Sequence, residues 1–181
     1  MTMDLAPTPS PHRLVPQALT PAAFAPFGTV LAVEGQPDAL PQRSINSGNA
    51  QRYDLLADLE LTAAGGVPTV ALFRAQARQF PLPITEMERH ALGSQTFVPL
   101  GTQRFVVVVA RGGEAPQAQD LQAFVTDGRQ GVVLAPGTWH HALLAVEGGD
   151  FVVVERRATE VDCEVCSLVE QCFCDGEGID A

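Results

Sequence analysis

The sequence predicts an all-β domain of antiparallel strands with minor helix, and a double-sheet jelly roll is the favoured form. From Val67 onward, short apolar runs rich in β-branched residues alternate with turn residues, at the spacing of antiparallel sandwiches and barrels. One run, Phe105 to Ala110, is apolar throughout, so we expect it in the middle of a sheet that is covered on both faces.

Turn and capping residues divide the chain into elements. Thr20 and Pro21 predict the cap and first turn of a short helix over Pro21 to Phe24, which is followed by a strand over Thr29 to Val33. Glu34 to Gln42 is rich in turn formers and is expected to be a loop, whereas the weak alternation of Tyr53 to Leu61 fits either a helix or a strand. Nine further strands are expected, over Val70 to Arg74, Gln79 to Leu82, Glu86 to His90, Thr96 to Pro99, Phe105 to Ala110, Ala123 to Thr126, Gly131 to Leu134, His141 to Val146 and Phe151 to Glu155.

The length of 181 residues and the mass of 19.2 kDa fit one domain of ordinary size. We expect an irregular arm over residues 1–15, a β-barrel domain over residues 16–157 and an acidic, cysteine-containing segment over residues 158–181. Seven acidic residues and no basic residue lie between Ala158 and Ala181, and their mutual repulsion predicts an irregular segment that lies on the body.

The composition excludes several classes of function. The chain has no lysine, so Schiff-base chemistry, pyridoxal phosphate anchoring and P-loop phosphate binding are excluded. A formal net charge of −10 argues against nucleic acid as a partner. No apolar run is long enough to cross a membrane, and the N-terminus lacks the basic and apolar blocks of a secretory peptide. We therefore expect a cytoplasmic protein.

All four cysteines, Cys163, Cys166, Cys172 and Cys174, fall in the acidic segment. Their spacing, Cys-x2-Cys and then Cys-x-Cys, has two interpretations. The four thiolates could bind one zinc ion, although structural zinc sites usually separate their two pairs by a longer loop. The interpretation that we prefer is four free thiols in a reducing cytoplasm, one or two of them packed against the body.

Two short segments contain three of the four histidines. In the first, Glu88 and His90 project from one face of a strand, and a turn at Leu92-Gly93 returns Gln95 to that face. Polar side chains that converge inside an apolar barrel cost several kcal/mol unless they bind one another, a metal ion or a ligand. The alternative is an exposed strand face that carries an ordinary glutamate and histidine.

The second segment is Gly137-Thr138-Trp139-His140-His141, which begins at a predicted tight turn. On a strand, Trp139 and His141 point away from His140, so only one of the two histidines can face the interior. Adjacent histidines alone are therefore a weak metal signal, but either of them could complete a site with the first segment.

The order of these segments resembles a known family. Glu88-x-His90-x4-Gln95 stands in the place of the first cupin motif, His-x-His-x(3,4)-Glu, and Gly137-x-x-His140 resembles the second, Gly-x-x-His. Over about Val15 to Cys174 the chain is similar to the bacterial ureidoglycolate lyase family. Six segments carry this similarity: Ile45-Asn46-Ser47-Gly48, Arg52-Tyr53, Arg74-Ala75-Gln76, Glu88-Arg89-His90-x-Leu92-Gly93-x-Gln95, Phe105 to Ala110 and Trp139-His140-His141.

The resemblance implies a cupin-type double-stranded β-helix, a homodimer, and cleavage of the small molecule ureidoglycolate to glyoxylate and urea in allantoin catabolism. Nickel, Ni²⁺, is associated with the family, and Glu88, His90, Gln95 and His140 would be its ligands here. This set departs from the general cupin pattern, because Glu88 replaces a histidine and Gln95 replaces a glutamate. A neutral amide binds a metal ion more weakly than a carboxylate does.

The implied reaction requires a base and an acid around one carbon atom. Breaking the C–N bond of ureidoglycolate removes the proton of its hydroxyl group and protonates the departing nitrogen. Glu88 and His140 could serve, with His90 as the third catalytic candidate. A metal ion could instead hold the alkoxide, with His141 or water as the acid. The sequence leaves both mechanisms open.

The carboxylate of the substrate calls for a planar bidentate donor or a set of backbone amides, and in a chain without lysine the side-chain candidates are Arg74 and Arg52. The resemblance adds Asn46 and Gln95 as substrate-binding residues. Two alternative functions are a cupin module that binds a small ligand without turning it over, and a metal-dependent cupin oxygenase, which would require two or three histidines around iron.

Overall fold

The computed structural model describes residues 10–36, 42–55 and 59–179. Its strands are β1 (His12–Leu14), β2 (Gln17–Ala18), β3 (Gly28–Leu31), β4 (Gln42–Ile45), β5 (Ala50–Tyr53), β6 (Val67–Ala75), β7 (Leu82–Arg89), β8 (Gln95–Pro99), β9 (Phe105–Ala110), β10 (Gln122–Val125), β11 (Gly131–Leu134), β12 (Trp139–His140), β13 (Leu144–Ala145), β14 (Gly149–Arg157) and β15 (Glu164–Cys174). Its helical elements are α1 (Pro21–Phe24) and the 3-10 turns Asn46–Gly48, Ala63–Gly65 and Ala118–Asp120. Parts of four predicted segments lie outside the described residues: residues 1–9 of the arm, residues 37–41 of the loop, residues 56–58 of the stretch from Tyr53 to Leu61, and residues 180–181 of the acidic segment.

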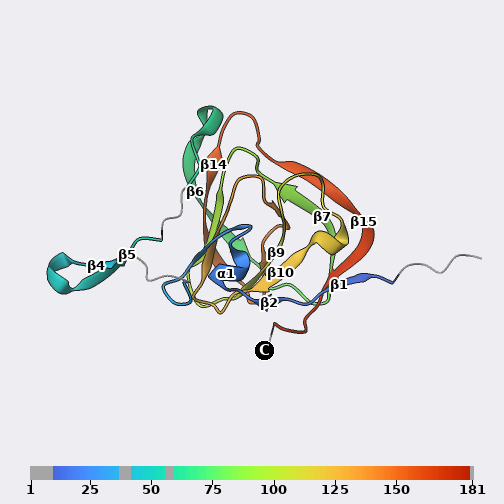
Figure 1. The fold of residues 1–181 in the computed structure, drawn as a ribbon, viewed down its shortest axis with the longest axis horizontal. Coiled ribbons are helices and arrows are strands. Elements are labelled where there is room, and N and C mark those ends of the chain that lie inside the picture. Colours follow the sequence, from blue (N-terminus) through green and yellow to red (C-terminus); the bar gives the residue numbers. More distant parts are fainter. Residues whose placement is uncertain (1–9, 37–41, 56–58, 180–181) are drawn as a thin grey trace, which may run out of the picture.

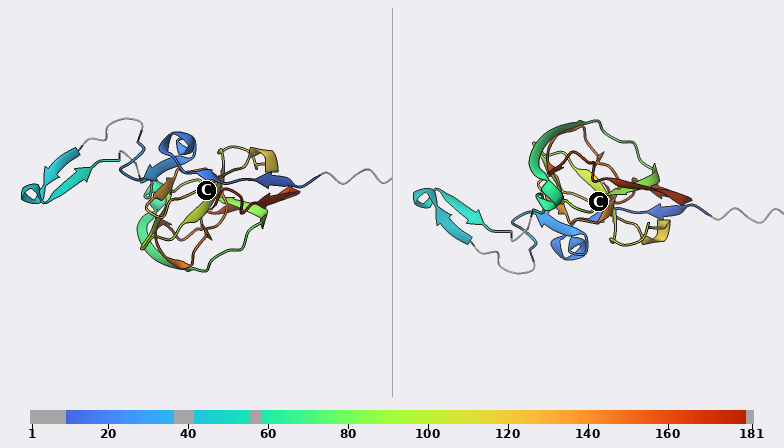
Figure 2. Two further views of the ribbon diagram at one scale, coloured as in Figure 1. Left: turned by 90° about the horizontal axis from the view of Figure 1, so that it is seen from below. Right: turned by 90° about the horizontal axis from the view of Figure 1, so that it is seen from above.

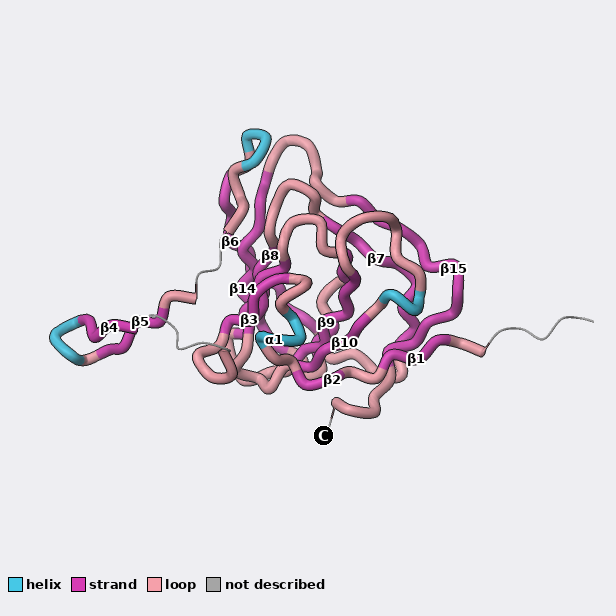
Figure 3. Tube along the Cα trace, in the orientation of Figure 1, coloured by secondary structure: helices cyan, strands magenta, loops and turns pink. Residues whose placement is uncertain are grey.

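Two curled sheets form the barrel (Figures 1 and 3). The larger sheet has the strand order β1-β15-β7-β12-β9-β10-β2, with β13 also paired to β9, and the smaller sheet has the order β3-β11-β8-β14-β6. Neighbouring strands are antiparallel except where β1 joins β15 and where β2 joins β10. This arrangement confirms the predicted all-β, cupin-type barrel with minor helix. Within the described ranges, no helix has the length and apolar character to span a membrane.

Strand β9 lies inside the larger sheet and separates two hydrophobic cores. Its odd-numbered residues, from Phe105 to Val109, belong to the core between the two sheets, which we call the interior core. Its even-numbered residues, from Val106 to Ala110, belong to the core on the opposite face of the larger sheet, which we call the outer core. All six residues are buried. The prediction that both faces of this run are covered is therefore confirmed.

The predicted short helix is α1. Thr20 caps it, because its Oγ1 accepts a hydrogen bond from the backbone N–H of Ala23 at 3.2 Å. Pro21 occupies the first turn, where its missing N–H costs nothing. The fully buried Phe24 then packs against Phe27 and Phe124, at ring-centroid distances of 5.9 and 5.7 Å. The helix thereby covers one end of the interior core.

Two of the predicted strands are wrong. Gln79 to Pro81 form no strand, the chain bends at Phe80 and Pro81, and β7 begins only at Leu82. Pro81 has no N–H with which to join a ladder. His141 to Val146 contains only the two residues of β13. The chain bends at Ala142, whose carbonyl lies 2.8 Å from Nδ1 of His141.

The acidic C-terminal segment is not irregular, which corrects the prediction. Strand β15 spans eleven residues and pairs with β7, which places it in the larger sheet. Cys172 and Cys174 project into the outer core, and their burial there outweighs the repulsion between the acidic residues. The N-terminal arm is regular where His12–Leu14 pairs with β15. None of the four cysteines of this segment, all of which lie in the described residues, forms a disulfide.

Strands β4 and β5 form a separate two-stranded sheet. This hairpin projects away from the barrel, as the views in Figures 1 and 2 agree. Its tip is the turn Asn46–Gly48, in which Asn46 and Ser47 have positive φ angles of 52° and 56°. The hairpin therefore carries Asn46 and Arg52 away from the barrel interior.

Candidate active site

The larger sheet presents Glu88 and His140 to the inside of the barrel. His140 of β12 lies opposite Glu88 of β7 and Val109 of β9. Residues that lie opposite one another in neighbouring strands project from the same face. Because Val109 belongs to the interior core, Glu88 and His140 face inward as well. Trp139, the neighbour of His140, projects into the outer core, as strand alternation predicts.

His90 follows directly after β7 and completes a compact group with these two residues. Glu88, His90 and His140, which we call the triad, each offer one potential ligand atom, and these atoms lie within 4.8 Å of one another. The imidazole centroids of His90 and His140 are 5.3 Å apart. His140 is only 2% exposed, whereas Glu88 and His90 are half-buried.

The backbone orients both imidazole rings in the same way. Nδ1 of His140 lies 3.0 Å from the carbonyl oxygen of Thr138, and Nδ1 of His90 contacts the carbonyl oxygen of Asp162. A carbonyl oxygen only accepts hydrogen bonds, so each Nδ1 carries a proton, and in the neutral ring each Nε2 then has a free lone pair. Both Nε2 atoms are buried and have no hydrogen-bond partner. Histidines that bind metal ions through Nε2 are usually held in this manner.

Glu88 is the anionic member of the triad. Its interaction with His140 outweighs the opposing effect of burial and holds the pKa of Glu88 below its ordinary value. The carboxylate Oε1 lies 3.5 Å from Nε2 of His140. This lowering of the pKa requires a proton or a cation between the two atoms, because a neutral imidazole lone pair and a carboxylate repel each other at this distance. Two imidazole nitrogens and one carboxylate therefore fit a divalent metal ion.

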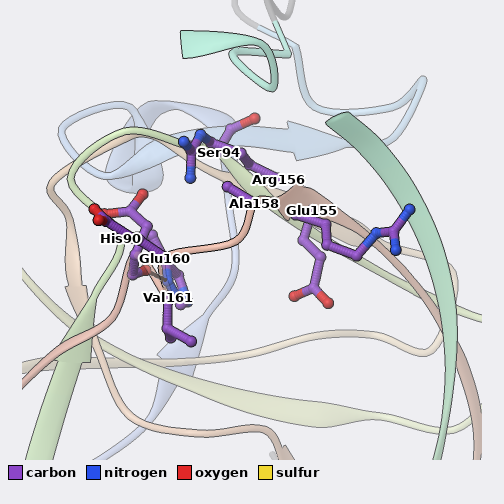
Figure 4. Close-up of a pocket in the computed structure, with 10 residues that line it drawn as sticks. His90, Ser94, Glu155, Arg156, Ala158, Glu160 and Val161 are labelled. Atoms are coloured by element: carbon purple, nitrogen blue, oxygen red, sulfur yellow. Dashed lines mark hydrogen bonds between the residues drawn. The ribbon is translucent and has the colours of Figure 1, made fainter. Parts of the chain in front are cut away.

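A cavity of about 210 Å³ opens beside the triad, and His90 belongs to both. Ser94, Glu155, Arg156 and Asp162 are among its other lining residues. Figure 4 shows His90 and Glu155 on opposite sides of this cavity. Its volume lies below the roughly 300–1,000 Å³ of a typical drug-sized site, so the cavity suits a small metabolite.

The family model of ureidoglycolate lyase matches residues 11–175 of this chain. The chain is 46% identical over 155 residues to the ureidoglycolate lyase of Burkholderia cepacia, with 84% of each chain covered. It is 40% identical over 154 residues to the ureidoglycolate lyase of Pseudomonas syringae pv. syringae, covering 84% of this chain and 88% of the relative. This chain belongs to the ureidoglycolate lyase family.

The structure places the other predicted site residues apart from the triad. Gln95 lies on β8 of the smaller sheet, where its Nε2 donates to Oε2 of Glu155 at 3.0 Å. Arg74 is on the outer face of β6, with a side chain that is 85% exposed, and forms an ion pair with Asp150. Strand alternation explains the outward position of Arg74, since Ala71 and Ala75 on the other face of β6 pack against the interior core.

Arg52 and Asn46 lie on the projecting hairpin and do not line the cavity. Arg52 is paired there with Asp54 at 2.6 Å. His141 stands outside the triad, because strand alternation turns it away from the face that carries His140.

Sequence reasoning missed three residues of the site, namely Glu155, Asp162 and Cys163. The Asp162 carboxylate accepts hydrogen bonds from the backbone N–H groups of Ala91 and Leu92, at 3.0 and 2.7 Å. The Cys163 thiol donates to Oε2 of Glu88 at 3.7 Å, and burial together with the Glu88 charge raises the pKa of this thiol. The clustering of acids and cysteines after residue 157 pointed to the segment that holds Asp162 and Cys163, but it gave no indication of their contacts, and no sequence signal pointed to Glu155.

Proposed function

We propose that this chain cleaves ureidoglycolate to glyoxylate and urea at the triad. Membership of the ureidoglycolate lyase family supports the reaction. The observation that carries the assignment of the site is the pair of buried, unpartnered Nε2 atoms of His90 and His140, which lie beside a cavity for a small metabolite.

The substrate has one carbon atom that bears a hydroxyl group, a carboxylate and a nitrogen of urea. Cleavage moves the hydroxyl proton to that nitrogen as the C–N bond breaks, and the oxygen becomes the aldehyde oxygen of glyoxylate. With Nδ1 bonded to a carbonyl oxygen, the neutral rings of His90 and His140 accept a proton or a cation at Nε2. The triad therefore belongs at the hydroxyl end of the substrate.

We infer that Glu88, His90 and His140 hold a divalent metal ion, and the family resemblance favours Ni²⁺. When bound, such an ion would acidify the hydroxyl group of the substrate. Glu88 supplies the negative charge of the site, because its pKa is lowered. The carbonyl oxygens of Thr138 and Asp162 keep the two Nε2 lone pairs directed at the site.

The direct test is incubation of the purified protein with racemic ureidoglycolate, with and without added Ni²⁺. We expect glyoxylate and urea to appear in equal amounts. The metal content of the protein, measured separately by mass spectrometry, should fall when Glu88 is replaced by alanine. Protein that carries Ni²⁺ and releases no glyoxylate would overturn the proposal.

The triad also supports a second candidate function. Two histidines and one carboxylate are the ligands of non-haem iron(II) oxygenases. Family membership favours the lyase, whose reaction needs no dioxygen. An oxygenase would consume dioxygen and stop under nitrogen, and a binding module would return ureidoglycolate unchanged. A turnover rate that is equal in air and under nitrogen excludes both.

We further propose that the chain forms a homodimer in the cytoplasm. Strand β6 is an edge of the smaller sheet, and Val70 and Leu72 are each 69% exposed. A second copy placed against this edge would cover the exposed apolar surface and the unpaired backbone groups. The four free thiols suit the reducing environment of the cytoplasm.

A further inference from the structure

The smaller sheet contributes a second polar group to the interior of the barrel. Gln95 of β8 lies opposite Glu155 of β14. Phe97 and Val153, two residues away on the same strands, belong to the interior core. Because alternate residues of a strand share a face, Gln95 and Glu155 both point inward. We call these two residues the Gln95–Glu155 pair.

The Gln95–Glu155 pair has unused capacity to accept hydrogen bonds. Nε2 of Gln95 donates to Oε2 of Glu155 at 3.0 Å, which fixes the orientation of the amide and leaves its Oε1 as an acceptor. This Oε1 atom is buried without a partner, and Gln95 as a whole is only 6% exposed. A buried acceptor without a partner costs free energy, so a ligand that supplies N–H donors would stabilise the site.

The pair reaches the cavity through Glu155, and the triad reaches it through His90. Glu155 and His90 line the same cavity, on opposite sides (Figure 4). The two sides have different chemistry: the triad presents lone pairs suited to a cation, whereas the other side presents the Glu155 carboxylate, with the Gln95 amide hydrogen-bonded to it. A molecule that lies between them must carry N–H donors at the end that faces the pair.

We propose that the Gln95–Glu155 pair is a binding subsite for the ureido group of the substrate, a role that rests on the proposed function. A ureido group presents neighbouring N–H donors, which match the two acceptors, and the Glu155 carboxylate repels the carboxylate of the substrate. The substrate is thereby oriented with its hydroxyl group toward the triad. Gln95 is in this way assigned to the substrate and not to the metal ion.

The test uses two unreactive probes that differ at one end. N-carbamoylglycine keeps the ureido group and the carboxylate but lacks the hydroxyl group, and N-acetylglycine replaces the terminal NH₂ with a methyl group. We expect the metal-loaded wild-type protein to bind N-carbamoylglycine about tenfold or more tightly than N-acetylglycine in calorimetry, since losing a hydrogen bond to a charged acceptor typically has this effect.

The Glu155→Gln variant keeps nearly the same shape and should reduce this preference to about twofold or less, by removing the charge of the acceptor. Gln95→Met, which removes the acceptor from β8 with little change in volume, should reduce it as well. Glu170→Gln makes the same chemical change on the exposed surface of β15 and should keep the preference of the wild-type protein.

Three outcomes overturn the inference: no preference in the wild-type protein, no measurable binding of either probe, or a wild-type preference that survives in both Glu155→Gln and Gln95→Met. The probes do not react, so binding is independent of turnover. A wild-type protein that shows the preference and releases no glyoxylate from ureidoglycolate would support the subsite and overturn the proposed reaction.

Discussion

The position of His90 depends on Asp162, which is 72 residues away in the sequence. The Asp162 carbonyl oxygen binds the ring of His90, and its carboxylate binds the two backbone N–H groups that follow His90. One residue therefore fixes both the imidazole and the turn after it. Asp162 is a positioning residue, because it acts on the triad only through His90.

We expect Asp162→Ala to weaken Ni²⁺ binding and to lower kcat, each by about 10–100-fold, the usual effect of losing a group that orients a metal ligand. The released Ala91-Leu92 turn would let the His90 ring move. Calorimetric titration with Ni²⁺ measures the affinity independently of turnover. Asp150→Ala, which removes an exposed ion pair with Arg74, serves as the control. An unchanged Ni²⁺ affinity in Asp162→Ala would contradict the positioning role.

In strand β15, the burial of two cysteine side chains outweighs the repulsion between acidic residues. Its acidic residues Glu164 and Glu170 are exposed, whereas Cys172 and Cys174 lie in the outer core. Burial raises the pKa of Cys172 to about 11 and that of Cys174 to about 12, so both thiols are neutral at physiological pH. The strand thus packs on the barrel through uncharged groups.

These raised pKa values predict a loss of stability in alkaline solution. Below about pH 9 the two thiols are neutral in the folded and unfolded states, so their contribution is fully present. Above that pH the unfolded state ionises first, and stability falls until the pH reaches the folded-state pKa values. The thermal midpoint should therefore fall between about pH 9 and pH 11, with a smaller slope in Cys174→Ala. Leu168→Ala removes an apolar side chain that packs against the same outer core, and it should keep the wild-type dependence of the thermal midpoint on pH. An equal dependence on pH in Cys174→Ala and in the wild type would be inconsistent with this account.

The strands that the sequence predicts well are those whose burial follows directly from their pattern. Strand β9 is apolar at every position and is covered on both faces. Strand β15 mixes acids, cysteines and apolar residues over eleven positions and changes register against β7 between Ser167 and Cys172. This irregularity hides the alternation, so composition alone suggests an irregular tail.

At the scale of the whole molecule, the barrel brings together groups from distant segments. Glu88, His90 and His140 are predictable because each lies in a short motif of a family pattern. Glu155 is not predictable in this way, since its position depends on the register of β14 against β8. The pairing of β6 with β14 decides which residues of β6 face outward, and Arg74 is one of them. The sequence alone does not specify this pairing.

The exposed edge of β6 leads to a prediction about assembly. We expect the wild-type protein to be a dimer in light scattering at micromolar concentration. Val70→Asp together with Leu72→Asp would place charges on the proposed interface and shift the protein toward monomers. Val169→Asp, at a residue that is 95% exposed on β15, should leave the mass unchanged. A wild-type protein with only the monomer mass would refute the dimer.

The most direct test of the proposed active site is the rate of glyoxylate release in His140→Ala. His140 is the most buried member of the triad and supplies one of its two free Nε2 atoms. We predict that kcat/KM for ureidoglycolate falls by at least about a hundredfold, while circular dichroism confirms that the variant is folded. A folded His140→Ala variant that releases glyoxylate at the wild-type rate would contradict the assignment of the reaction to this site.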